Sequence, residues 1–275
     1  MPELPEVETI RRDLARLLPG RTLLNVSVAD PAALTGHRTR PDPAAVADFI
    51  RRAEGGTVRE ILRRGKYLIM EFTDGGAILF HLRMTGQLIV SQPDGSERLR
   101  LGFSGGRTLC FRDRRRLGEA LFCRDWREHP RIAGLGAEPL NGGWGAEALG
   151  KILRGRTAPI HPVLLNQKLV SGIGNIYATE ALHRAGILPD RPAGKIRRGE
   201  IAVLAGAVRD VLARSVRNRG TSMDTYVDAL GRKGRSQLFT AVYGKAGGDC
   251  PTCHAKIRKK VLGGRGVSYC PGCQR

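Results

Sequence analysis

The spacing of apolar residues divides the chain into a helical start, a strand-rich stretch and a helical second half. Apolar residues recur at helical intervals from Val7 to Leu18, ahead of a stop at Gly20, which predicts an amphipathic helix. Short apolar runs between glycine-rich turns then predict strands at residues 57–62, 67–72, 77–82, 99–103 and 108–111. Because no helical pattern separates these runs, they favour an antiparallel sandwich or barrel.

The second half begins with a loop-like linker at residues 133–140, which contains Gly-Leu-Gly-Ala-Glu-Pro. Helices are expected after it at residues 146–153, 162–169, 175–185 and 201–217. The chain is therefore expected to have an α+β fold. Its expected domains cover residues 2–132, 141–245 and 246–275.

The charge of the chain indicates its partner. Among 275 residues, 46 Lys and Arg outnumber 26 Asp and Glu, which gives a formal net charge of +20. This excess predicts a polyanionic partner, foremost a nucleic acid. A membrane surface is the alternative, but the sequence shows no apolar run of transmembrane length and no lipidation signal. The sequence shows no signal segment, so a cytoplasmic protein is expected. No helix shows a sustained coiled-coil pattern, so a monomer is expected.

Four of the six cysteines form two Cys-x2-Cys pairs separated by sixteen residues. This spacing is typical of a four-thiolate Zn²⁺ site, and redox use of one pair is the less favoured alternative. The expected ligands are Cys250, Cys253, Cys270 and Cys273. Four thiolates leave no open position for a water nucleophile, so the metal is expected to be structural. Cys110 and Cys123 lie in apolar stretches and are expected to be small buried residues.

The start of the chain offers a candidate nucleophile. Once Met1 is removed, Pro2 is a terminal secondary amine, and chain-terminal amines have a reference pKa of about 7.7–8.0. Much of such an amine is neutral at physiological pH, and its attack on a sugar carbon gives an iminium that acts as an electron sink. Glu3 and Glu6 lie beside it and can move protons. Taken alone, the terminus favours a frayed tail ahead of a helix over a nucleophile, and Glu6 also suits the helix dipole.

A tight glycine turn precedes the helix expected at residues 175–185. Backbone amides of Gly172 and Gly174, with the side chain of Asn175, can hold a DNA phosphate at the helix N-terminus. A simple packing corner between two helices is the alternative for this turn.

Several separate motifs resemble one known family. They lie in order at residues 2–9, 64–68, 80–86, 172–178 and 269–273, along essentially the whole chain. On these motifs the chain is similar to the bacterial formamidopyrimidine-DNA glycosylase family, which also contains endonuclease VIII. The resemblance implies an N-terminal helix with a two-sheet β-sandwich, a helix-two-turn-helix domain and a β-hairpin zinc finger.

The resemblance also implies base-excision repair. A glycosylase of this kind removes oxidised purines such as 8-oxoguanine and formamidopyrimidines, and its lyase activity then cleaves the abasic site by β,δ-elimination. Pro2 would attack the sugar, Glu3 would transfer protons and Glu6 would assist beside the amine. An endonuclease VIII-like preference for oxidised pyrimidines is the alternative within the family. A non-catalytic zinc protein that binds nucleic acid is the alternative outside it.

Three residues match those that the family inserts into DNA once the damaged base is flipped out. Met84 and Leu117 would act as apolar wedges, and Arg115 would bond the opposite base. Without the family, the sequence favours a core methionine, a strand leucine and a surface arginine. Leu117 replaces the usual phenylalanine, so opposite-base selectivity stays open.

Other residues match positions that hold the DNA backbone. Lys66, Asn175 and Arg265 would contact phosphates, although Lys66 taken alone is a solvated strand lysine. His161 stands where the family has lysine, and its phosphate contact is expected to weaken as the pH rises from about 6 to about 8. Residues 231–236 replace a loop that covers the flipped base in the family, so the exact lesion preference stays open.

Overall fold

The computed structural model describes residues 2–34 and 43–275, so Met1, whose removal is expected from the sequence, lies outside the described residues. The chain forms two compact units. The first unit contains Met1–Ala133 and Asn218–Gln237, and the second contains Gly134–Arg217 and Leu238–Arg275. Residues 218–237 thus pack with the N-terminal part, whereas the sequence pattern grouped them with the helices that precede them.

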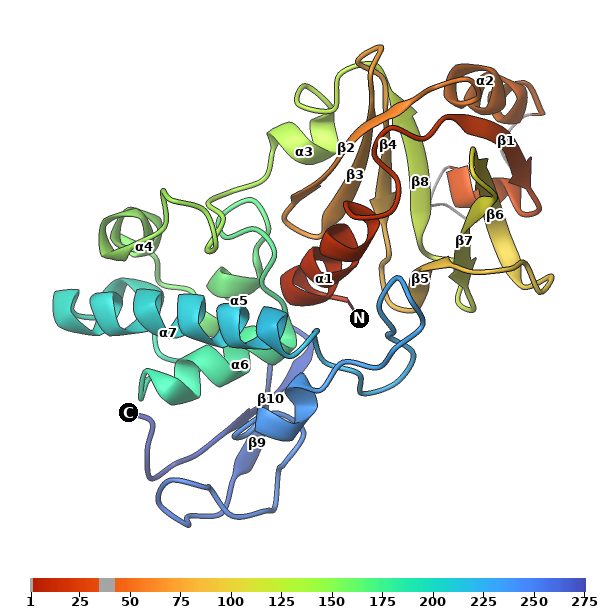
Figure 1. The fold of residues 1–275 in the computed structure, drawn as a ribbon. Helices are drawn as coiled ribbons and strands as arrows, with labels where there is room; N and C mark the ends of the chain where they lie inside the picture. Colours follow the sequence, from red (N-terminus) through yellow and green to blue (C-terminus); the bar gives the residue numbers. More distant parts are fainter. Residues whose placement is uncertain (1, 35–42) are drawn as a thin grey trace. The chain divides into compact units, whose positions relative to one another are not determined.

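Helix α1 (Leu4–Leu14) opens the first unit (Figure 1). Glu3 is its N-cap and forms a reciprocal capping box with Glu6, which satisfies backbone donors that the first turn leaves unpaired. Its apolar stripe, Val7, Ile10 and Leu14, is at most 1% exposed. The helix ends earlier than the expected stop at residue 20.

Two antiparallel four-stranded sheets form the rest of the first unit, as expected (Figure 1). One sheet has the order β1 (Leu23–Val28), β6 (Glu97–Phe103), β7 (Arg107–Asp113), β5 (Gly86–Val90). The other has the order β2 (Val58–Arg64), β3 (Tyr67–Phe72), β4 (Ala77–His81), β8 (Glu119–Cys123). Smaller elements are η1 (Pro31–Leu34), α2 (Pro43–Ala53) and α3 (Pro130–Ala133).

The core of the first unit lies between the sheets and beneath α1. Phe80 of β4 and Phe111 of β7 meet edge to face across the two sheets, with ring centroids 6.1 Å apart. Every residue of β3 is buried, because α1 packs on β2 and β3 over the face that the sandwich core leaves uncovered. The start of the chain therefore rests on a fully packed framework.

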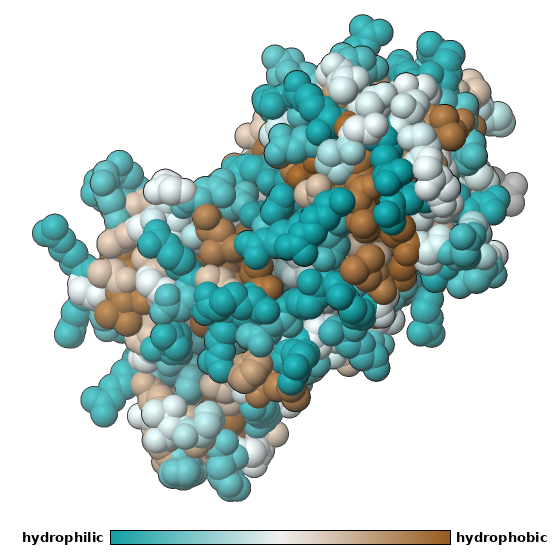
Figure 2. All heavy atoms as spheres, viewed as in Figure 1, coloured by the Kyte–Doolittle hydropathy of each residue, from teal (hydrophilic) through white to brown (hydrophobic). Residues whose placement is uncertain are grey.

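The second unit is helical. Its helices are α4 (Ala146–Leu153), α5 (Ile160–Leu165), α6 (Asn175–Arg184) and α7 (Arg198–Arg217), with short turns η2 (Ala193–Lys195) and η3 (Ser236–Phe239), the latter crossing from the first unit. Helix α6 packs on α5 and α7 and is buried on nearly all sides. No described helix is long and apolar enough to cross a lipid bilayer, and hydrophilic residues cover most of the face shown in Figure 2.

A two-stranded hairpin, β9 (Arg258–Leu262) and β10 (Arg265–Tyr269), closes the second unit. Gly263 and Gly264 join the strands with φ of +54° and +73°. A two-residue turn with both φ values positive strongly favours glycine, which explains this pair. The hairpin packs on α6. The α+β fold with its cysteine-bearing hairpin, expected from the sequence, is thus confirmed.

Candidate active site and phosphate-binding residues

Glu6 ties the start of α1 to the segment at residues 218–237. Its side chain is buried, its Oε2 accepts the backbone N–H of Glu3 at 2.8 Å, and its Oε1 accepts that of Thr221 at 2.7 Å. A Cβ at Gly220, where φ is +80°, would lie 2.8 Å from Glu6 Oε1. The carboxylate is thus enclosed by backbone and fixes the geometry of the first turn.

Pro2 and Glu3 stand directly before this turn and are both buried. The hydroxyl of Tyr226 donates to the carbonyl of Glu6 at 3.3 Å, which adds a second link from residues 218–237 to α1. Burial raises the pKa of Tyr226 well above its ordinary value, and the charge of Glu6 adds to this. The tyrosine therefore stays neutral and acts as a hydrogen-bond donor. Pro2 therefore directly precedes a helical turn that is fixed by the hydrogen bonds of Glu6 to Glu3 and Thr221.

Lys66 lies in the turn between β2 and β3 and is only 7% exposed. Its positive charge acts on His81, a buried residue at the end of β4. The ring of His81 packs edge to face against that of Tyr67. Burial, with the charges of Arg83, Lys66 and Arg131, lowers the pKa of His81 to about 3. His81 is therefore neutral at physiological pH. The sequence did not single out this electrostatic interaction between a cation and a neutral imidazole.

Met84 lies, half-buried, in the turn between β4 and β5. The neighbouring Thr85 donates its hydroxyl to a carboxylate oxygen of Asp113, which is itself 5% exposed. The backbone N–H of Gly86 closes the turn on the carbonyl of Leu82 at 2.9 Å. The position of Met84 is therefore set by the buried aspartate through its neighbour.

The same aspartate organises the turn that carries Arg115 and Leu117. Asp113 accepts the backbone N–H of Arg115 at 3.1 Å and that of Leu117 at 2.8 Å. The buried Arg98 lies 3.6 Å from it and donates to the carbonyl of Gly118 at 2.9 Å. Arg115 is exposed and Leu117 is half-buried. The structure thus brings the two turns with the three predicted insertion residues together around one carboxylate.

Asp113 was missed from the sequence. An aspartate directly before an arginine-rich turn is a known turn-forming signal, because its side chain accepts backbone N–H groups two residues on. That signal identifies one turn, but not the second turn that the same side chain holds.

Asp228 anchors the altered loop at residues 231–236 through hydrogen bonds to Arg232. This buried carboxylate accepts the backbone N–H of Arg232 at 3.0 Å and pairs with Arg219. Burial raises the pKa of Asp228, but its hydrogen bonds outweigh burial and lower it overall. A Cβ at Gly234 would lie 2.2 Å from the carbonyl of Gly220, so the loop passes tightly over the segment that contacts Glu6. Its exposed side chains include Arg232, Lys233 and Arg235.

In the second unit, Asn175 is the first residue of α6 and bridges two neighbours. Its Oδ1 accepts the Nε2 hydrogen of His161 at 3.0 Å, and its Nδ2 donates to the carbonyl of Gly266 at 3.1 Å. The exposed Arg265 precedes Gly266 on β10, and its charge acts on His161. Three residues predicted to contact phosphates therefore lie in one cluster.

The predicted role of His161 is wrong. The side chain of His161 is fully buried, and burial lowers its pKa to about 4. The charge of Arg265 also lowers this pKa, whereas the hydrogen bond to Asn175 raises it by a smaller amount than burial lowers it. His161 is neutral from pH 6 to 8 and cannot carry the expected titration. Its Nε2 orients Asn175 instead, while its Nδ1 is buried with no hydrogen-bond partner among the described residues.

The predicted phosphate contact of Gly172 is also wrong. Its φ is +89°, and its N–H donates to Oε1 of Gln167 at 2.9 Å, so this amide is already used. The amide of Gln167 in turn donates to the carbonyls of Leu165 and Ile173, both at 2.8 Å. Gln167 therefore shapes the glycine turn and occupies the amide of Gly172.

The hairpin module, residues 238–275, contains the four cysteines. Their sulfur atoms all lie within 4.8 Å of one another. Burial raises the pKa of Cys270 and Cys273, whereas backbone amides at Thr252 and Cys253 outweigh burial and lower the pKa of Cys250 to about 5. Four thiols this close do not all ionise without a cation, and bound metal deprotonates its thiol ligands. This donor set fits a metal ion that prefers tetrahedral thiolate ligands.

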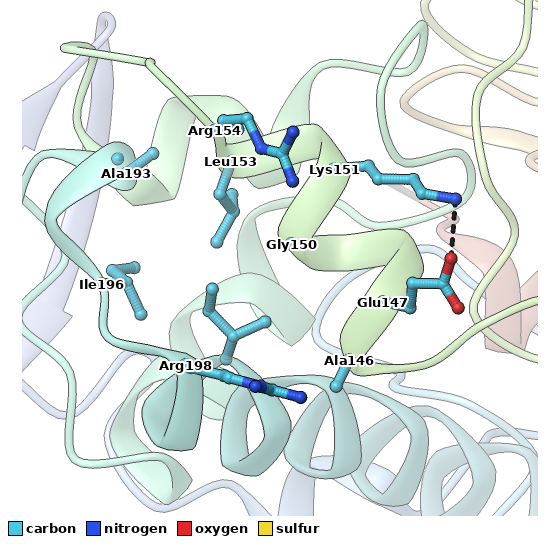
Figure 3. A pocket seen from close by; sticks show the side chains of 11 residues that line it. Ala146, Glu147, Gly150, Lys151, Leu153, Arg154, Ala193, Ile196 and Arg198 are labelled. Carbon is cyan, nitrogen blue, oxygen red and sulfur yellow. Dashed lines mark ion pairs between the residues drawn. The ribbon is translucent and has the colours of Figure 1, made fainter.

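A separate hollow of about 750 Å³ lies between α4, η2 and α7 (Figure 3). Leu153 and Ile196 line it, together with Arg154 and Arg198. None of the predicted site residues lines this hollow. It is therefore distinct from the cluster around Asn175.

Comparison with known proteins identifies the family. The model for the formamidopyrimidine-DNA glycosylase N-terminal domain matches residues 1–120, and that for the formamidopyrimidine-DNA glycosylase H2TH domain matches residues 135–227. The formamidopyrimidine-DNA glycosylase of Pelotomaculum thermopropionicum is 40% identical over 281 residues, which cover 100% of this chain and 99% of that protein.

Solved structures agree. The MutM (Fpg) protein of Thermus thermophilus matches with a TM-score of 0.87 and 38% identity, over 99% of this chain and 98% of that one. A complex of Lactococcus lactis Fpg with abasic-site DNA matches with a TM-score of 0.88 and 32% identity, over 99% of each chain. Complexes of the L. lactis protein with an oxidised pyrimidine or N7-benzyl-Fapy-dG match at 0.88 and 0.89. The chain belongs to the formamidopyrimidine-DNA glycosylase family.

Proposed function

We propose that this enzyme removes oxidised purines, namely 8-oxoguanine and formamidopyrimidines, from duplex DNA and then cleaves the strand at the abasic site. The observation that carries the proposal is the proline start of the chain, held on a buried, carboxylate-clamped turn in a member of a DNA glycosylase family. The net charge of +20 suits the DNA substrate, and a cytoplasmic location follows from that substrate.

The reaction begins when the damaged nucleotide is flipped out of the helix, at a cost of a few kcal/mol. After removal of Met1, the neutral nitrogen of Pro2 attacks the first carbon of the sugar, and the bond to the base breaks with its electron pair leaving on the base. The attacking nitrogen then loses its proton, and the bond between the first carbon and the ring oxygen breaks while Glu3 protonates that oxygen. The product is an open-chain iminium whose positive charge acidifies the neighbouring sugar proton. Loss of that proton expels the 3′ phosphate, and a second elimination expels the 5′ phosphate.

Glu3 and Glu6 have separate tasks in this proposal. Glu3 protonates the sugar ring oxygen and later transfers protons during elimination. Glu6 accepts backbone N–H groups through both of its oxygens, which supports a positioning role for it beside the amine. One carboxylate therefore does chemistry while the other keeps the first turn in place.

Met84, Leu117 and Arg115 fill the space that the flipped nucleotide leaves. The shared contacts to Asp113 support this role, because they hold both turns in one arrangement. Apolar wedges keep the neighbouring base pairs apart, and the guanidinium fork of Arg115 bonds the opposite base.

Lys66, Asn175 and Arg265 bind phosphates of the damaged strand. Asn175 donates one Nδ2 hydrogen to Gly266, which leaves the second hydrogen for a phosphate oxygen at the N-terminus of α6. His161 supports this contact because it holds the carboxamide oxygen.

The four cysteines hold one structural Zn²⁺. Cys250, Cys253, Cys270 and Cys273 would be its ligands, and a bound ion would neutralise their thiolates and order the hairpin that bears Arg265.

Oxidised pyrimidines are the second candidate substrate. The L. lactis relative has been crystallised with DNA that contains one, and the loop at residues 231–236 presents exposed cations in this chain.

Single-turnover assays on duplexes with 8-oxoguanine, a ring-opened purine or thymine glycol test the proposal. Base release and strand cleavage are expected to be faster for both purine lesions than for thymine glycol. The reverse order would assign the enzyme to pyrimidines. Binding without base release from any duplex would leave only a nucleic-acid-binding role.

A further inference from the structure

Helix α6 contacts the hairpin module (residues 238–275) at several points along its length. Glu180 accepts the backbone N–H groups of Ala241, Val242 and Tyr243 at 2.7, 3.0 and 2.7 Å. Val242 belongs to the small core of the module, together with Cys250 and Cys270. The buried carboxylate of Glu180 therefore joins the helix to the hairpin module through hydrogen bonds from three backbone N–H groups.

One turn further along α6, a histidine reaches a predicted metal ligand. Nε2 of His183 lies 3.5 Å from the sulfur of Cys250, and His183 is 9% exposed while Cys250 is fully buried. Because Glu180 and His183 are three residues apart, they lie on the same face of the helix. A metal-bound thiolate can only accept a hydrogen bond, so the imidazole nitrogen at this contact must carry the hydrogen.

We propose that His183 is a positioning residue of the metal site: its Nε2–H donates to the Cys250 thiolate, delays metal release and links metal occupancy to helix α6. The proposal rests on metal binding by the four cysteines. An N–H donor withdraws electron density from the sulfur and fixes the direction of its lone pairs. The sequence shows no sign of this contact, because the two residues are 67 positions apart.

The link has a consequence for the phosphate cluster. Asn175 lies at the opposite end of α6, eight residues from His183 and about 12 Å along the helix axis. It is bonded to Gly266 in the hairpin of the same module. Helix α6 thus connects the metal site with the proposed phosphate site. His183 and Glu180 attach the hairpin module to the helix near the metal site, and Asn175 attaches it at the other end.

Metal release from the zinc-loaded, full-length protein tests the proposal. The probe is Zn²⁺ itself, and its transfer to an excess of a chromophoric chelator is followed over time. His183→Phe, which keeps the ring volume but removes the donor, is expected to release zinc about 10–100-fold faster. His183→Gln, which retains a donor, is expected to restore much of the retention. His129→Phe, a histidine removal in the first unit, is the matched control and is expected to match wild type.

Two further readouts separate this role from simple packing. In the Co²⁺-substituted protein, the sulfur-to-metal absorption band of His183→Phe is expected at longer wavelength, because an unbonded thiolate gives up its electron more easily. In wild-type zinc-loaded protein, ¹⁵N NMR is expected to show His183 protonated at Nε2, which requires no variant to fold.

A phenylalanine variant with the wild-type release rate and an unshifted band would overturn the proposal, as would a wild-type His183 protonated only at Nδ1. Wild-type protein that holds no zinc would overturn both this proposal and the metal site. Unchanged metal release with zinc bound would remove only the role of His183.

Discussion

The two units hold their functional residues by different means. In the first unit, Glu6 and Asp113 are buried carboxylates that accept backbone N–H groups from the turns they organise. A core that includes Phe80 and Phe111 surrounds this arrangement. In the second unit, Asn175 depends on His161 and on the hairpin that carries Gly266.

The hairpin module has little apolar support of its own. Its described core cluster contains Val242, Ile257 and two of the cysteines, Cys250 and Cys270. So small a core does not offset the entropy of ordering a segment, which is why such modules need a metal. The turn proposed to react is thus held by the protein's own carboxylates, whereas the proposed phosphate contacts of Asn175 and Arg265 depend on a hairpin whose four cysteines fit a metal ion.

The largest effect is expected from a lysine inserted between Met1 and Pro2, which converts the Pro2 nitrogen into an amide. An amide nitrogen is not nucleophilic, so base release and strand cleavage should fall to the background rate while DNA binding persists. Single-turnover cleavage of an 8-oxoguanine duplex measures this, and the same residue added at the C-terminus is the control. Cleavage by the extended protein at the wild-type rate would rule out Pro2.

Replacement of the proposed proton donor is expected to be nearly as severe. Glu3→Gln keeps a side-chain acceptor for the capping box but cannot transfer a proton, so the rate should fall about 10²–10⁴-fold. The exposed Glu60→Gln serves as the control. A small rate loss with an unchanged pH profile would assign proton transfer to another group.

Metal removal should separate the two units. A chelator is expected to cost the phosphate contacts of Asn175 and Arg265, which at about 1.5–3 kcal/mol each weaken DNA binding roughly 10²–10⁴-fold. Melting of the first unit, followed by calorimetry, should stay near that of the loaded protein. Full DNA affinity in the metal-free protein would mean that the hairpin is ordered without the ion.

Asp113→Ala tests the carboxylate framework of the first unit. The change strips three backbone N–H groups and the hydroxyl of Thr85 of their buried acceptor, whereas Arg98 keeps its ion pair with Asp30, so the free energy of unfolding should fall by about 3–5 kcal/mol. Asp94→Ala, which removes an exposed carboxylate paired with Arg112, should change the free energy of unfolding far less, because water screens an exposed ion pair. Urea unfolding of both variants gives the comparison, and equal losses would show that Asp113 is not a framework residue.

The smallest effect concerns His161. Its pKa in the folded protein, about 4, lies below the usual value of 6.5. Its contribution to stability is therefore complete above pH 6.5 and is lost as the pH falls toward 4, by about 3 kcal/mol at most. Relative to His161→Gln, wild type should lose stability over that window only. DNA affinity should show no His161-dependent change from pH 6 to 8, and a titration there would return His161 to direct phosphate contact.

The strongly patterned elements could be predicted from the sequence, but three strands could not. Strand β3 and helix α4 follow their predicted bounds because their apolar patterns are continuous. Strand β8 reads Glu-Ala-Leu-Phe-Cys, which favours a helix locally, and it is a strand because it pairs with β4. Strands β1 and β5 carry polar residues or glycine and are likewise fixed by their partners.

The site residues show the same limit. The four cysteines carry their geometry in their spacing and meet as expected. The contact between Glu6 and Thr221 spans 215 positions and leaves no local pattern, so the segment around Thr221 was grouped with the wrong part of the chain. His161 was misjudged because its residue type suggests a titratable surface group, whereas its burial depends on tertiary packing.

Trapping of the covalent intermediate tests the central claim most directly. The enzyme is incubated with an 8-oxoguanine duplex, reduced with borohydride, digested and mapped by mass spectrometry. The account predicts that the reduced sugar adduct lies on the nitrogen of Pro2 in a chain that lacks Met1. An adduct on Lys66 or another lysine, or no adduct in a preparation that releases the base, would contradict it.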